Sequence, residues 1–292
     1  MLGRARPHPV IVAPTAYHRL AHPEGEEATA RGAAAAGAIF CLSSLATAGP
    51  PEIAAAAPDG ERWFQLYVFR DRGVSRELIR AATENGYEAI AITVDMPVLG
   101  IRERDVRSQY VIPDALASPS MEAMGRDRAF SLLQIGELID PSLTWRDVEE
   151  FASESRLPVL VKGVLTPEDA RLAAEHGAAG VVVSNHGGRQ LDTVVSGADA
   201  LPAVAEAVGD RIDVIVDGGV RRGTDVLKAL ALGARAVMVG RPVIWGLVTD
   251  GEDGVRAVLD LILAEFDIAL ALAGVPRASA LGPTSVELRD SG

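Results

Sequence analysis

The stretch SNHGGRQLD, residues 184–192, carries the most distinctive pairing of reactive side chains in the sequence. His186 and Arg189 stand three residues apart on a glycine-rich turn that follows an apolar run. An imidazole can accept a proton, and a guanidinium can bind a carboxylate through two parallel hydrogen bonds. Asp95, at the end of another apolar run, could hold the imidazole in one tautomer and stabilise its cation. The pattern favours a site that binds a carboxylate and accepts a proton.

A second pattern, near residue 220, is typical of an anion site. DGGVRRGTD, residues 217–225, combines consecutive glycines, two arginines and a helix start, and VGRP adds Gly240 and Arg241. Backbone N–H groups at such turns bind phosphate, and α/β barrels often place the phosphate there. Thr224 stands where a Walker A motif needs lysine, and no GxGxxG follows a strand, so neither a P-loop nor a Rossmann dinucleotide site is expected.

Polar side chains also interrupt or end the other apolar runs. Gln65, Thr93 and Lys162 lie inside such runs, where contact with solvent does not explain them. The residues at the ends of runs are Thr15, Ser43, Tyr67, Asp95, Ser184, His186, Asp217, Gly240 and Arg241. In a barrel these positions point into one shared cavity at the carboxyl ends of the strands.

Eight short apolar runs alternate with alanine-rich helical patterns that begin at acidic or capping residues and end at glycine. The runs cover residues 10–14, 40–44, 63–68, 89–95, 158–164, 180–186, 213–219 and 236–242. Continuous apolar runs are typical of parallel strands buried on both faces. We therefore predict a (β/α)8 TIM barrel forming a single domain over residues 1–292, with a doubly wound open sheet as the rival. Residues 96–157 are expected to form a long loop between strands 4 and 5 that could act as a lid.

Composition narrows the classes of partner. Acidic residues outnumber basic ones by 40 to 28, giving a net charge of −12, and no basic run supplies a nucleic-acid or anionic-membrane surface. No apolar run reaches the roughly 18 residues of a membrane span, and the first residues do not form a signal peptide. A lone Cys41 indicates a reducing compartment. We expect a cytoplasmic protein that binds a small molecule, with no metal site, because HExxH is absent.

The motifs together resemble the FMN-dependent α-hydroxy acid oxidase and dehydrogenase family, which includes glycolate, lactate and hydroxymandelate oxidases. The resemblance rests on SNHGGRQLD, LVKG, VDGGVRRGTDVLKALALGA, APTAYHRLAHPEGE, LSSLAT, FQLYVFRD and TVDMPVLGIRERD, so it covers nearly the whole chain. It implies FMN as cofactor, oxidation of an (S)-2-hydroxy acid to the 2-oxo acid, and a homotetramer. It also implies O2 or another electron acceptor, with hydrogen peroxide formed if the acceptor is O2.

The resemblance implies a role for each residue around the substrate. His186 would be the active-site base, paired with Asp95. Arg189 and Arg102 would hold the substrate carboxylate, and Tyr67 would hydrogen-bond the substrate hydroxyl or carboxylate. Whether the α-hydrogen leaves as a hydride or as a proton stays open.

For the cofactor, the resemblance implies that Lys162 lies by the pyrimidine edge of the flavin and supports negative charge there. The other FMN contacts implied are Thr15, Ala16, Ser43, Gln65, Thr93, Ser184, Asp217, Gly219, Arg221, Gly240 and Arg241. Leu45 stands where glycolate oxidases carry tryptophan, which hints at room for a longer or aromatic substrate side chain.

One departure leaves alternatives open. Relatives have a helical segment with a further active-site tyrosine ahead of the first strand, and we expect both to be missing here. An FMN-binding barrel with little or no turnover is therefore the alternative function. A third possibility from the residues alone is a Schiff-base aldolase that uses Lys162 and needs no flavin.

Overall fold

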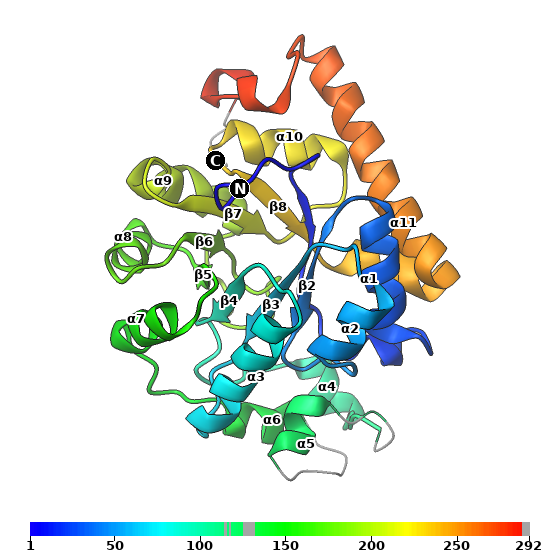
Figure 1. Cartoon of the computed structure of the whole chain (residues 1–292). Coiled ribbons are helices and arrows are strands. Elements are labelled where there is room, and N and C mark those ends of the chain that lie inside the picture. Colours follow the sequence, from blue (N-terminus) through cyan, green and yellow to red (C-terminus); the bar gives the residue numbers. More distant parts are fainter. Residues whose placement is uncertain (114–115, 117, 125–131, 288–292) are drawn as a thin grey trace.

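The computed structural model describes residues 1–113, 116, 118–124 and 132–287, and these form a closed barrel of eight parallel strands (Figure 1). The strands pair in chain order, and β1 closes the ring by pairing with β8. Their bounds are β1 Val10–Val12, β2 Ile39–Ser43, β3 Arg62–Leu66, β4 Ile90–Thr93, β5 Val159–Val164, β6 Gly180–Val183, β7 Asp213–Asp217 and β8 Ala236–Val239. The predicted (β/α)8 barrel is confirmed, and the doubly wound sheet is excluded because the sheet has closed.

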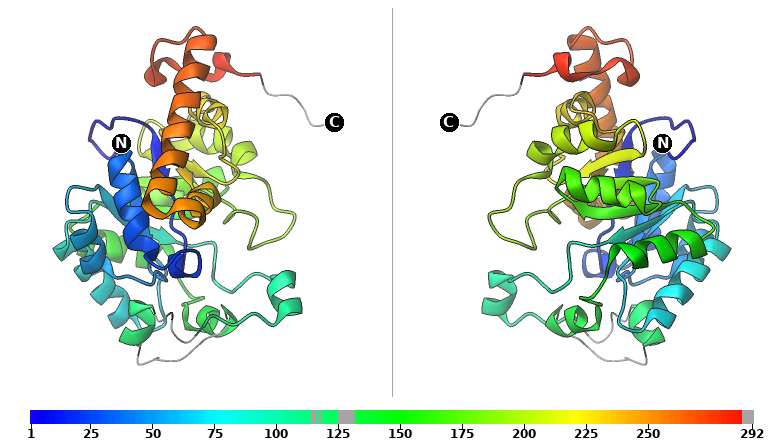
Figure 2. Two further views of the ribbon diagram at one scale, coloured as in Figure 1. Left: turned by 90° about the vertical axis from the view of Figure 1, so that its right-hand side faces the viewer. Right: turned by 90° about the vertical axis from the view of Figure 1, so that its left-hand side faces the viewer.

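Helices surround the barrel, as the two side views show (Figure 2). Those that follow successive strands are α1 Gly25–Ala35, α2 Pro50–Ala56, α3 Arg72–Glu84, α7 Trp145–Glu154, α8 Pro167–Glu175, α9 Gly197–Val208, α10 Gly223–Ala231 and α11 Arg241–Leu272. N-cap side chains mark where two of these helices begin. Thr166 accepts a hydrogen bond from the Asp169 N–H at the start of α8, and Ser196 accepts one from the Asp199 N–H at the start of α9. Within the described residues, no helix has the length and apolar character needed to cross a membrane.

Successive side chains along each strand point to opposite faces of the sheet, and this divides the core into two parts. One set of side chains packs between the strands and the helices. The other set fills the barrel interior and includes Ile11, Cys41, Trp63, Ala91 and Leu160. Because residues two apart share a face of a strand, Ser43, Gln65, Thr93 and Lys162 continue these interior rows toward the carboxyl ends. The same rows therefore supply apolar core at one end of the barrel and polar groups at the other.

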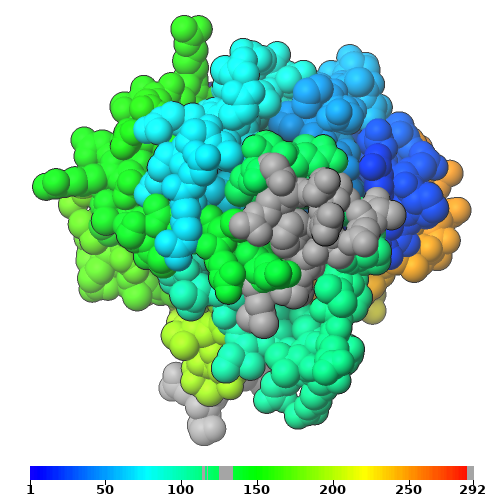
Figure 3. Space-filling view, turned by 90° about the horizontal axis from the view of Figure 1, so that it is seen from below, coloured from blue at the N-terminus to red at the C-terminus, as the bar shows by residue number. Residues whose placement is uncertain are grey.

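The connection between β4 and β5 differs from the long loop expected over residues 96–157. It contains α4 Glu103–Ser108, α5 Pro119–Ala123 and α6 Leu132–Leu138, and its last part is the barrel helix α7. Thr144 is the N-cap of helix α7, and its N–H and hydroxyl both donate to Asp147 Oδ2 at 2.7 Å. The helix buries Val148 and Phe151. The weakly periodic stretch SPSMEAMGRDRAFS, residues 118–131, lies partly outside the described residues. Helices α4, α5 and α6 gather at one end of the barrel (Figure 1), and green atoms of this connection lie on the face seen from that end (Figure 3).

The first residues of the chain cover the opposite end of the barrel. Met1 and Leu2 pack against the interior core, and the Leu2 N–H donates to Asp213 at the start of β7. The Arg6 side chain is only 7% exposed and pairs with Glu88 at 2.7 Å and with Glu61. This end is therefore closed by apolar contact and ion pairs, which leaves the carboxyl ends of the strands as the open face.

Candidate functional site

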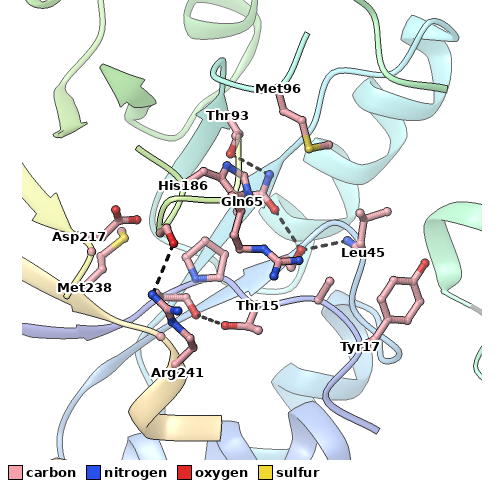
Figure 4. Close-up of a pocket in the computed structure, with 18 of the residues that line it drawn as sticks. Thr15, Tyr17, Leu45, Gln65, Thr93, Met96, His186, Asp217, Met238 and Arg241 are labelled. Atoms are coloured by element: carbon pink, nitrogen blue, oxygen red, sulfur yellow. Dashed lines mark hydrogen bonds between the residues drawn. The ribbon is translucent and has the colours of Figure 1, made fainter. Parts of the chain in front are cut away.

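A cavity of about 410 Å3 opens at the carboxyl ends of the strands and brings most of the predicted site residues together (Figure 4). The predicted residues that line it are Thr15, Ala16, Ser43, Leu45, Gln65, Tyr67, Thr93, Arg102, Lys162, His186, Arg189, Asp217, Gly219, Arg221, Gly240 and Arg241. They come from all eight strands or the connections that follow them. Asp95 and Ser184 are the exceptions: both lie behind the lining and contact it.

A hydrogen-bonded row of polar side chains forms one part of the cavity floor. The Ser43 hydroxyl donates to Gln65 Oε1 at 3.1 Å, and the backbone N–H of Ser44 donates to the same oxygen at 3.3 Å. Gln65 Nε2 then donates to Thr93 Oγ1 at 2.9 Å. All four residues are buried, so the row fixes which amide and hydroxyl groups face the cavity.

Lys162 lies across the floor in contact with two partners. Its Nζ donates to Ser184 Oγ at 2.9 Å and pairs with Asp217 Oδ2 at 2.7 Å. Burial disfavours the charged form, but the negative charges of Asp217 and Asp95 outweigh it and raise the pKa of Lys162 above its ordinary value. The lysine is thus a fixed cation rather than a free amine. This disfavours the Schiff-base aldolase, which needs an uncharged nucleophile.

His186 is oriented from two sides. Its Nδ1 lies 2.9 Å from Asp95 Oδ1, and its Nε2 lies 3.3 Å from the Tyr67 hydroxyl. A carboxylate only accepts hydrogen bonds, so Nδ1 carries the hydrogen and Nε2 presents a lone pair. The backbone of His186 is left-handed, with φ of 58°, and its N–H donates to Ser184 Oγ at 3.0 Å. A left-handed non-glycine residue is uncommon and concentrates at functional sites.

Gly163 makes room for the Asp95 carboxylate. It has φ of 109° within an irregularity in the pairing of β5 with β6. A Cβ at this position would lie 2.6 Å from both Cβ and Cγ of Asp95. The glycine after Lys162, inside the motif LVKG, is therefore needed for the Asp95–His186 pair.

Positive charge gathers where the sequence predicted a carboxylate site. Arg102 and Arg189 both line the cavity beside Tyr67. Desolvation, and then the neighbouring charge of Arg189, lower the pKa of Arg102. Burial raises the pKa of Tyr67 above its ordinary value, so its hydroxyl stays protonated. A bound carboxylate would relieve the repulsion between the two guanidiniums.

The far end of the cavity has the features of a phosphate site. Gly218 and Gly219 have positive φ, and Gly219 has open space where a side chain would stand. Gly240 is the N-cap of helix α11 and offers no side-chain hydrogen bond, and Arg241 donates to the carbonyl of Gly187 at 3.4 Å. The N-terminus of α11 has no side-chain cap, and Arg221 and Arg241 line the cavity beside it. This combination suits an anion.

Sequence reasoning missed two groups of residues. The first is an apolar wall contributed by Tyr17, Met96, Leu99, Ile112 and Ile135. Four of these lie in the β4–α7 connection, which was expected to be part of a long loop. The second is Gln190, whose side chain contacts the connection after Asp95; its place inside SNHGGRQLD was the available signal. Ser184, predicted to touch the cofactor, is fully buried and instead contacts Lys162 and His186.

The chain is similar to known proteins along nearly its whole length. A family model described as FMN-dependent dehydrogenase matches residues 1–288. The chain belongs to the FMN-dependent dehydrogenase family. Glycolate oxidase of Spinacia oleracea is 50% identical over 281 residues, which are 94% of this chain and 76% of that protein. The 2-hydroxyacid oxidase 1 of Homo sapiens is 44% identical over 98% of this chain and 80% of its own length. A crystal structure of mandelate oxidase superposes with a TM-score of 0.89 at 45% identity, covering 96% of this chain and 79% of that one.

Membership in this family makes FMN the cofactor, and the residues present fit it. The glycines and arginines after β7 and β8 suit the phosphate. Asp217 Oδ1 is buried and has no hydrogen-bond partner among the described residues, so it is available to a ribityl hydroxyl. The row from Ser43 to Thr93 presents amide and hydroxyl groups to an isoalloxazine ring, and Lys162 supplies a fixed positive charge. The match to FMN thus rests on charge, hydrogen bonding and space together.

Proposed function

We propose that this chain oxidises a 2-hydroxy acid to the corresponding 2-oxo acid with FMN. The observation that carries the proposal is one cavity in which His186 Nε2 faces the Tyr67 hydroxyl at 3.3 Å beside Arg102 and Arg189. A proton acceptor and a carboxylate clamp at the flavin site match the two functional groups of a 2-hydroxy acid. When bound, FMN supplies the two-electron acceptor for the reaction.

Each protein group has a task in this scheme. Arg102 and Arg189 bind the substrate carboxylate and fix its orientation. Tyr67 donates a hydrogen bond to the hydroxyl or carboxylate oxygen of the substrate. His186 Nε2 accepts a proton from the substrate. Asp95 stabilises the imidazolium that results, because its carboxylate already accepts the Nδ1 hydrogen.

We further propose that the preferred substrates carry a large apolar side chain. The apolar wall of Tyr17, Met96, Leu99, Ile112 and Ile135 lies in the same cavity as Leu45, and each buried methylene contributes about 0.8 kcal/mol. A similar solved structure is a mandelate oxidase variant with (S)-mandelic acid, which is an aromatic 2-hydroxy acid. Support for O2 as electron acceptor comes from relatives named as oxidases.

The decisive experiment is anaerobic mixing of the purified holoenzyme with glycolate, (S)-lactate, a straight-chain 2-hydroxy acid and (S)-mandelate. Bleaching of the visible flavin band reports oxidation of the substrate. We expect bleaching with all four and the highest kcat/KM for the acids with large side chains. Admission of air should restore the band and form hydrogen peroxide. A yellow protein that none of these acids bleaches would instead support the FMN-binding barrel without turnover.

We also propose how the chain assembles and where in the cell it is found. A homotetramer in the cytoplasm is supported by the family resemblance, the lone cysteine and the exposed apolar side chains Trp245, Val248, Leu261 and Ile268 on α11. Sedimentation velocity at several concentrations tests the assembly, and a species of four chains is the expected result.

A further inference from the structure

The side-chain amide of Gln190 forms hydrogen bonds with one segment of the β4–α7 connection. Its Nε2 donates to the carbonyls of Asp95 and Val98, both at 3.0 Å. Its Oε1 accepts the backbone N–H of Gly100 at 3.2 Å. One side chain from the turn after β6 therefore binds three backbone groups between residues 95 and 100.

The same two segments also meet through direct backbone contact. A Cβ at Gly100 would lie 2.6 Å from the Arg189 carbonyl oxygen and 2.7 Å from Gln190 Cα. Only glycine allows this approach. The amide contacts and the close packing are two parts of one contact between the same pair of segments.

Each segment carries residues of the substrate site. The segment that starts at Asp95 holds the carboxylate paired with His186 and leads to Arg102. The turn after β6 carries His186 and Arg189. The two arginines bear like charges, and Arg189 contributes to lowering the pKa of Arg102. Like charges on the two segments repel each other when no carboxylate lies between them, which favours a contact that holds the segments in register.

We propose that Gln190 is a positioning residue that holds the two segments in register, so that Arg102 and Arg189 are pre-arranged for one carboxylate and Asp95 stays against His186. This inference rests on the proposed function for the identity of the ligand. It assigns to Gln190 no contact with substrate or cofactor, since Gln190 does not line the cavity. The role is pre-organisation, which lowers the cost of ordering the site on binding.

The first test measures the segment itself and needs no turnover. Hydrogen–deuterium exchange of peptides spanning residues 96–104 is compared between the parent holoenzyme, Gln190→Ala and Leu191→Ala. Leu191 is the matched control because it is the next residue on the turn and is 73% exposed. We expect faster exchange in these peptides for Gln190→Ala only, since the Gly100 N–H loses its acceptor. Unchanged exchange would overturn the proposal.

The second test separates binding from chemistry. The dissociation constant of oxalate, an unreactive carboxylate, is titrated through the flavin spectrum in the same variants. We expect Gln190→Ala to raise this constant and KM about 10- to 100-fold, as loss of several hydrogen bonds would do, with FMN retained and a smaller fall in kcat. A change in kcat alone, or equal effects of Leu191→Ala, would contradict the role.

A double-mutant cycle tests whether Gln190 and Gly100 act on the same contact. Gly100→Ala should weaken oxalate binding much as Gln190→Ala does, and the double variant should be little worse than either, because both act on one contact. Fully additive effects would show that the two features act separately and would overturn the shared role. If the parent holoenzyme binds oxalate but oxidises none of the acids tested, the proposed function fails while the positioning role stands.

Discussion

At the scale of single residues, His186 and Arg189 share one turn but have separable tasks. We expect His186→Ala to retain FMN and to slow substrate-dependent flavin bleaching by roughly 10²–10⁴-fold, the usual weight of general acid–base catalysis. Asp95→Asn should resemble it, because the Asp95 carboxylate holds Nδ1 at 2.9 Å. Arg189→Lys should mainly weaken carboxylate binding, because it loses the planar fork. Stopped-flow bleaching and oxalate titration on the three variants separate these outcomes. Bleaching of His186→Ala at the parental rate would move the base assignment to another group.

The pH dependence of the reaction should not come from Tyr67 or Lys162. Burial raises the pKa of Tyr67 above its ordinary 10.0, and the charges of Asp217 and Asp95 raise that of Lys162 above 10.5 against the effect of burial. Both groups therefore stay protonated below pH 10 in the folded protein. The folded pKa of Lys162 exceeds its unfolded one, so its pair with Asp217 contributes stability below pH 10.5 and loses it only as pH rises through the folded pKa.

We accordingly expect the rate of flavin bleaching to show no loss through these groups up to about pH 10. The matched comparison is Tyr67→Phe, whose rate is lower but whose alkaline profile should parallel that of the parent. A loss of rate near pH 9 in the parent that disappears in Tyr67→Phe would show that the hydroxyl ionises and would contradict the expectation.

At the scale of elements, the irregularity in β5 links strand geometry to catalysis. Gly163→Ala must adopt a left-handed backbone, at a cost of about 1–3 kcal/mol, and must also displace Asp95. We expect a lower free energy of unfolding in urea together with a slowed bleaching rate like that of Asp95→Asn. Gly274→Ala is the control, because Gly274 has φ of 69° but open space around its Cβ position. It should lose stability without losing rate.

The elements also show how far sequence reasoning reaches. The eight apolar runs predicted the strands because burial on both faces leaves a continuous pattern, and residues in phase with it, such as Gln65 and Lys162, were correctly expected in the cavity. The runs extended beyond the strands: β6 ends at Val183, so Ser184 and His186 belong to the turn. Helix α7 was missed because its pattern lies inside a long stretch without clear boundaries. The apolar wall was missed because contacts made by connections depend on how distant segments meet, which no local period reveals.

At the scale of the whole molecule, the two ends of the barrel divide stability from function. Arg6 lies at the closed end, where it pairs with Glu61 and Glu88 with a side chain only 7% exposed. We expect Arg6→Ala to cost about 2–3 kcal/mol, between the values for exposed and fully buried pairs, with the affinity for FMN and the bleaching rate unchanged. Urea unfolding and flavin titration check the two parts. A large fall in rate at unchanged stability would show that the two ends are coupled.

The alternation of interior and exterior side chains along each strand also constrains how the sequence of such a protein can change over generations. Inserting or deleting one residue within a strand would turn every later interior side chain toward the helices, so Gln65, Thr93 and Lys162 are inherited with the fold or lost with it. Met96, Leu99, Ile112 and Ile135 stand on a connection, where changes of length cost little. Descendants of this barrel can therefore acquire new substrates one loop change at a time while the redox chemistry is passed on intact.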